Sequence, residues 1–125
     1  MNDIQQATLK GNALKAALCD FQRQIETWDI ALPKVKPLVL DFGLGQFEKT
    51  GLLECWIANE LEAGYCGKYM FLFDGQSCPT HRHKEKIETF FVVKGNIALT
   101  LPDRIVDMAP GDTLLVQRWL YHSFT

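Results

Sequence analysis

The chain has 125 residues, a formal net charge of -2 at pH 7 and a hydrophobic content of 47%. This length and apolar content are typical of one globular domain with a real core, not of a disordered chain. The charge gives no cationic footprint for nucleic acid, and the apolar runs are shorter than the roughly 20 residues of a membrane span. Since the N-terminus lacks a secretory signal, the sequence predicts a cytoplasmic protein with a small polar partner and no nucleic-acid or membrane partner.

The N-terminal part of the chain has the pattern of an amphipathic helix. Apolar residues recur at spacings of three and four up to Trp28, Asn2 or Asp3 could cap the helix, and a break is expected near Gly11. We interpret this stripe as core contact rather than as a partner-binding face. The sequence therefore predicts a helical extension over residues 1–32 that packs on the remaining domain, residues 33–125.

The remaining domain has the pattern of short strands. Eight strands are predicted, at residues 38–42, 53–59, 68–73, 87–93, 97–101, 105–108, 113–116 and 119–124. Turns rich in glycine, proline and aspartate separate them, and no helical segment between them offers a parallel crossover. The predicted fold class is therefore all-β, an antiparallel sandwich or small barrel.

All three histidines of the chain lie at positions that could share one interior site. His81 and His83 project to the same face of a strand, and the next strand would turn Glu88 inward beside them. His122 has the same inward phase on the last predicted strand. Buried carboxylates and imidazoles need partners, and one divalent cation would serve all four side chains. The alternative is that each histidine is a hydrogen-bonded core residue, or lies on an exposed edge, and binds nothing.

The spacing of these residues resembles the signature motifs of the cupin superfamily. The first motif is Gly75-x5-His81-x-His83-x4-Glu88-x6-Gly95, and Pro110-Gly111-Asp112 followed by His122 resembles the second, with a longer gap than is common. The resemblance covers about residues 65 to 125. It implies a cupin-type antiparallel β-barrel, a jelly-roll-like double-stranded β-helix, behind the N-terminal helical extension.

Within the cupins, the chain looks most like the D-lyxose isomerase group of sugar isomerases. The segments that carry this likeness are Asp41–Gly45, Tyr65–Lys68, Phe73–Lys84 and Glu88–Phe90. The resemblance implies one divalent metal, usually Mn2+, with the ligands His81, His83, Glu88 and His122. It also implies that Lys68 meets the sugar, with Lys86 as a further candidate. For Lys68 a solvated strand end is an equal alternative, and for Lys86 a solvated hairpin tip is the simpler interpretation. Gln76 flanks the site and could bind a sugar hydroxyl.

The activity implied by this resemblance is metal-dependent aldose–ketose isomerisation, from D-lyxose to D-xylulose or on a related sugar. Three imidazoles and a carboxylate also suit Zn2+, Fe2+, Co2+ or Ni2+, and the bound ion would polarise a carbonyl beside a chelating hydroxyl. Two alternatives stay open. One is an Fe(II)-dependent cupin dioxygenase, and the other is a non-catalytic cupin that binds a metal or a sugar.

The position of His122, three residues before the last residue, adds two expectations. In the D-lyxose isomerase group the acid/base carboxylates follow the last metal-binding histidine, so we expect the barrel to lack its C-terminal part. The catalytic acid or base is then unassigned, with Lys68 and Lys86 as candidates. An unpaired strand edge beside His122 would be covered by a second chain, so a homodimer is predicted.

Overall fold

The computed structural model describes residues 7–125, and this part of the chain contains one helix and nine strands. The helix caps predicted at Asn2 and Asp3 lie outside the described residues. The described chain divides into two compact units, residues 7–76 and residues 77–125, and each is presented by itself.

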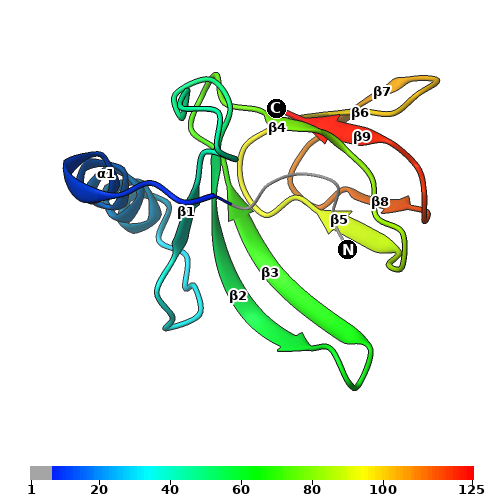
Figure 1. Ribbon diagram of the computed structural model, residues 1–125, viewed down its shortest axis with the longest axis horizontal. Helices are drawn as coiled ribbons and strands as arrows, with labels where there is room; N and C mark the ends of the chain where they lie inside the picture. The colour runs from blue at the N-terminus through cyan, green and yellow to red at the C-terminus, as the bar shows by residue number, and fades with distance from the viewer. Residues whose placement is uncertain (1–6) are drawn as a thin grey trace. The chain divides into compact units, whose positions relative to one another are not determined.

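Residues 7–76 combine the helix α1 with a three-stranded antiparallel sheet in the order β1-β2-β3 (Figure 1). The bounds of these elements are α1 Gly11–Trp28, β1 Leu38–Leu40, β2 Leu52–Glu60 and β3 Tyr65–Phe71. The helix begins at Gly11 (φ 62°) and is followed by Asp29 in the left-handed conformation (φ 53°). The prediction of helix upstream of Gly11 is wrong for residues 7–10, because Thr8 there bridges to Leu40 of the sheet.

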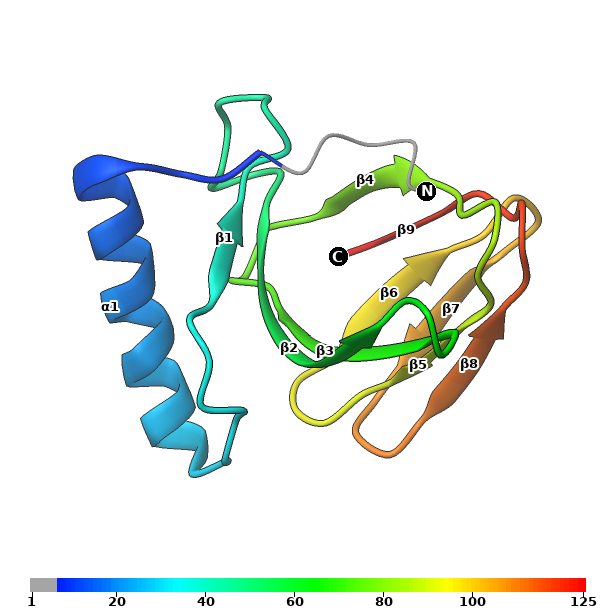
Figure 2. The same ribbon diagram turned by 60° about the horizontal axis from the view of Figure 1, so that its bottom comes forward.

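The helix covers the sheet through the apolar stripe that the sequence predicts. Ala17, Phe21 and Ile25 are buried in one cluster with side chains of β1 and β2. The ring of Phe21 also meets that of Phe71 on β3 edge to face, with 5.0 Å between centroids. Burying a side chain such as Phe21 stabilises the fold by about 1.5–3 kcal/mol. Figure 2 shows α1 running alongside β1.

Residues 77–125 form two antiparallel sheets, one in the order β4-β9-β6-β7 and one that pairs β5 with β8. The bounds are β4 Cys78–His81, β5 Glu88–Phe91, β6 Ile97–Thr100, β7 Ile105–Met108, β8 Thr113–Val116 and β9 His122–Phe124. Phe90 of β5 packs on Phe124 and His122 of β9, with 5.5 and 5.9 Å between ring centroids. Leu99 of β6 is completely buried. The apolar side chains of the two sheets thus enclose the end of β9.

The predicted fold class, antiparallel β-structure with an N-terminal helix, is confirmed. The eight predicted strands leave out β4, and several predicted bounds differ from the structure. The last strand, for example, begins at His122 and not at Trp119. Trp119 has a φ of 68°, which bulky residues adopt only where the chain turns, so the extended conformation cannot start there. The division of the domains at residue 33 stays a prediction.

Candidate metal centre

The structure brings the three histidines together in residues 77–125. His81 ends β4, His122 begins β9, and the antiparallel register pairs these two residues directly. His83 follows two residues after His81. All three side chains are buried, at 5%, 5% and 1% exposure for His81, His83 and His122. One ring nitrogen from each lies within 4.8 Å of the others, so the cluster could hold a single metal ion.

Backbone carbonyls orient two of the rings. Nδ1 of His81 is 2.8 Å from the carbonyl oxygen of Pro79, and Nδ1 of His122 is 2.9 Å from that of Leu120. A carbonyl oxygen only accepts hydrogen bonds, so each Nδ1 carries the hydrogen in the neutral ring and each Nε2 keeps its lone pair. This is the arrangement in which a second partner orients a metal-binding imidazole.

Two nitrogens of the cluster lack partners. Among residues 7–125, neither Nε2 of His122 nor Nδ1 of His83 has a hydrogen-bond partner, although both atoms are buried. A buried polar atom without a partner costs free energy, and such an exception needs an explanation. For His122 the nitrogen is the lone-pair atom, which is the atom that would bind a cation. The donor set therefore fits a divalent metal ion.

Glu88, the first residue of β5, supplies the negative charge beside the histidines. One carboxylate oxygen lies 2.5 Å from Nε2 of His83, and the other lies 3.9 Å from Nε2 of His122. Burial alone would raise the pKa of Glu88, but the hydrogen bond from His83 and the charges of His83, Lys86 and His122 outweigh it and lower the pKa to about 2. Glu88 is therefore ionised throughout the neutral pH range.

Burial lowers the pKa of the neighbouring His81 imidazole, whereas burial taken alone would raise the pKa of a carboxylate. Removal of His81 from water disfavours the charged ring and lowers its pKa to about 4, against the opposing hydrogen bond to Pro79. At neutral pH this ring is uncharged, and an uncharged imidazole is the form that binds metals.

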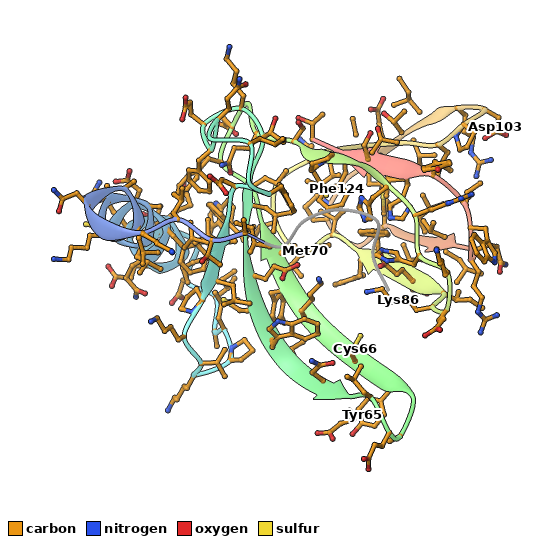
Figure 3. All side chains as sticks on the ribbon, viewed as in Figure 1. Tyr65, Cys66, Met70, Lys86, Asp103 and Phe124 are labelled. Carbon is orange, nitrogen blue, oxygen red and sulfur yellow. The ribbon has the colours of Figure 1, made fainter. Side chains whose placement is uncertain are left out.

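The three predicted sugar-contact residues lie in different surroundings. Lys86 extends beside the start of β5 (Figure 3), with Nζ 3.3 Å from the Glu88 carboxylate. In residues 7–76, Lys68 pairs with the buried carboxylate of Glu54 and lies over the ring of Trp56, 4.9 Å from its centroid. The contacts of these lysines are thus ion pairs in both units.

Gln76 is buried and joins two parts of its own unit. Its side-chain oxygen accepts a hydrogen bond from the backbone N–H of Phe73 at 2.8 Å, and its side-chain nitrogen donates to the carbonyl oxygen of Phe47. These contacts give the amide a structural role in holding the 47 and 73 loops together. A contact between Gln76 and a sugar stays a prediction.

Sequence reasoning missed Glu54 as the partner of Lys68. Glu54 is only 3% exposed, although it lies in the apolar strand Leu52–Glu60. The available signal was the single acid in the apolar run Leu52–Ala58, since a buried acid requires a positively charged or hydrogen-bonding partner.

Comparison with known proteins agrees with the arrangement of these strands and histidines. Residues 69–125 match the cupin domain family. A D-lyxose/D-mannose isomerase of Thermosediminibacter oceani is 43% identical over 67 residues, which cover 49% of this chain and 36% of the relative. The chain thus matches about a third of the length of that relative. Residues 69–125 are thus similar to a cupin domain, and the chain is similar over part of its length to a D-lyxose/D-mannose isomerase.

The one helix of residues 7–125, α1, is not long and apolar enough to cross a membrane.

Proposed function

We propose that the chain binds one divalent metal ion through His81, His83, Glu88 and His122, and acts as an aldose–ketose isomerase. The observation that carries the proposal is the cluster of three buried imidazoles, with an unpaired Nε2 on His122 and an ionised carboxylate beside it. The likeness to a D-lyxose/D-mannose isomerase supports a sugar substrate. Mn2+ is the proposed ion, following the resemblance to that group.

The proposed reaction moves a hydrogen between adjacent carbons of one sugar without an external oxidant. D-lyxose would become D-xylulose, or D-mannose would become D-fructose, as a proton moves from C2 to C1 and the hydrogen of the C2 hydroxyl moves to the oxygen on C1. A divalent ion supplies a positive charge that polarises the sugar carbonyl and makes the neighbouring C–H more acidic. The backbone bonds of His81 and His122 fix the ring orientations before substrate arrives.

Lys86 is the proposed sugar contact of the same unit. Its ammonium group lies 3.3 Å from Glu88, so it neutralises the carboxylate side of the site and offers donors to a hydroxyl group.

We also propose that Lys68 and Gln76 contact the sugar and that the protein acts as a homodimer. A monodisperse monomer in light scattering would contradict the dimer.

Metal analysis tests the proposed centre directly. The purified protein should carry close to one equivalent of divalent metal after incubation with Mn2+ and desalting, and His83→Ala should lose most of it. Glu88→Gln should also bind less, because it removes the negative charge 2.5 Å from His83. Glu85→Gln is the matched control, since Glu85 lies in the same segment but is exposed. Full occupancy in His83→Ala would refute the ligand assignment.

An activity assay tests the proposed chemistry separately from metal binding. The Mn2+-loaded chain, supplied with D-lyxose or D-mannose under nitrogen, should form the ketose, and transfer of the substrate C2 hydrogen can be followed with deuterated sugar. Product formation that requires oxygen would favour a dioxygenase. Metal binding without turnover of either sugar would leave a metal-binding cupin and remove the isomerase proposal for this chain.

A further inference from the structure

A cation and two aromatic rings pack together on the outer side of the histidine segment. Arg82 stands between His81 and His83 in the sequence, and its guanidinium carbon lies 4.6 Å from the ring centroid of Tyr121 and 5.0 Å from that of Trp119. A guanidinium over aromatic faces is attracted by the ring quadrupoles, and its flat shape suits stacking. Arg82, Trp119 and Tyr121 are called the outer clamp below.

Backbone contacts join the same two segments. The N–H of Trp119 donates to the carbonyl oxygen of His83 at 2.8 Å, and Nε of Arg118 donates to the carbonyl oxygen of Glu85 at 3.1 Å. In both views the segment between β4 and β5 runs beside the segment between β8 and β9 (Figures 1 and 2). Residues 82–85 and 118–121 are thus connected by two hydrogen bonds and three cation–π contacts, the third from Nζ of Lys84 to the Trp119 ring at 5.9 Å.

Trp119 is held in an unusual conformation at this junction. Its φ of 68° is in the left-handed region, which a bulky residue adopts only when the surrounding contacts compensate for the steric cost. The contacts that compensate are the hydrogen bond to His83 and the stacked guanidinium of Arg82. Half of the Trp119 side chain is exposed, at 52%, so burial contributes less than it would in a core.

One joined segment contains His83, and the other ends one residue before His122. Tyr121 immediately precedes His122, and Arg82 immediately precedes His83. Strand β4 ends at His81, so the direct pairing of His81 with His122 does not extend to His83. The position of the His83 ring relative to His122, at 5.4 Å between centroids, therefore depends on the contacts of residues 82–85 with residues 118–121.

We propose that the outer clamp is a positioning device for the metal centre, in which Arg82 stacked on Trp119 and Tyr121 sets the spacing between His83 and His122. None of the three side chains is a ligand. Their role is to hold two ligands at the separation that one cation requires. The proposal rests on the proposed metal centre and assigns to these outer residues the control of its affinity and geometry.

The direction in which Arg82→Ala changes metal affinity distinguishes a positioning role from a simple charge effect. Removing a positive charge next to a cation site relieves repulsion, so electrostatics alone predicts tighter metal binding in Arg82→Ala. A positioning role predicts the opposite. Loss of a group that orients metal ligands typically weakens metal binding 10–100-fold. The direction of the change therefore distinguishes the two explanations.

The experiment measures Co2+ and Mn2+ dissociation constants by competition with a chelator, together with the visible absorption spectrum of the Co2+-loaded protein. Arg82→Ala should bind both ions about 10–100-fold more weakly than the wild type and should show a changed Co2+ spectrum. Arg82→Lys, which keeps the charge but not the planar group, should fall between them. Arg104→Ala is the control, because it removes an exposed cation from the loop between β6 and β7 of the same unit.

A second pair of variants keeps the test decisive if Arg82→Ala does not fold. Tyr121→Phe retains the ring and should bind metal like the wild type, whereas Tyr121→Ala should reproduce the weaker binding and the altered spectrum. Unchanged constants and spectra in folded Arg82→Ala or Tyr121→Ala would overturn the clamp, even if thermal stability falls. A wild-type protein that binds neither ion would overturn the metal centre and the clamp together, which separates the two failures.

Discussion

Acid should destabilise the metal-free protein through His81. The pKa of this ring is lowered from 6.5 to about 4 in the folded chain because burial disfavours the charged form. Between these pH values the unfolded chain binds a proton that the folded chain excludes, so the free energy of unfolding rises with pH. The contribution is fully present above pH 6.5 and is lost as the pH falls toward 4.

The size of the effect follows from the separation of the two pKa values, about 2.5 pH units. Each unit corresponds to about 1.36 kcal/mol, so the complete loss is on the order of 3 kcal/mol. Most of this loss is complete by pH 4.5, where an unfolded imidazole is almost entirely protonated. The pKa of Glu88, at about 2, adds a second loss of the same sign, but only as the pH falls below its ordinary value of 4.5.

Urea unfolding of the EDTA-treated protein at pH 7.0 and pH 4.5 measures this loss. Replacing Trp28 and Trp56 by Phe leaves Trp119 as the fluorescent reporter of residues 77–125. His81→Gln keeps a polar side chain but cannot be protonated, so it should lose about 2 kcal/mol less than the wild type between the two pH values. The reasoning is refuted if His81→Gln shows the same pH dependence as the wild type.

Three substitutions test the packing of the two units. Lys68→Met should destabilise residues 7–76 by about 3–5 kcal/mol in urea unfolding, because Glu54 stays buried without its ion pair, and adding Glu54→Leu should restore most of this loss. Gly51→Ala should cost about 1–3 kcal/mol and lower the thermal midpoint, since its Cβ would lie 2.9 Å from the backbone oxygen of Phe47. Leu99→Ala should cost about 2–5 kcal/mol, measured in residues 77–125, because the side chain is completely buried.

The strand architecture and the meeting of the histidines could be predicted from local patterns. Alternation along a strand assigns His81 and His83 to one face, and each pairs or packs near His122 in the structure. The prediction that the histidines meet holds although β4 ends at His81 and its register shifts between Cys78 and His81, so strand alternation alone does not account for it. Turn residues bounded most of the strands, since glycine and proline act through local backbone geometry.

Long-range ion pairs are not accessible to the same reasoning. The sequence did not indicate that Lys68 pairs with Glu54, fourteen residues earlier in the chain; its contact with a sugar stays a prediction. The partner is determined by the register of β2 on β3, where Glu54 is opposite Met70 and Trp56 is opposite Lys68. Register depends on which turn closes the hairpin and where the Trp56/Ala58 irregularity falls, and neither follows from composition.

The outer clamp explains why the residues before His122 were wrongly predicted to be part of the last strand. Its residues, Trp-Leu-Tyr, have the composition of a strand, and the alternation that places His122 inward was extended back to Trp119. The left-handed conformation of Trp119 interrupts that alternation, and it places the ring against Arg82 instead of in a strand ladder. A local preference for β-structure is overridden here by contacts with a segment 36 residues earlier, between His83 and Trp119. The inward phase of His122 survives because β9 starts at that residue and its register with β4 is set independently.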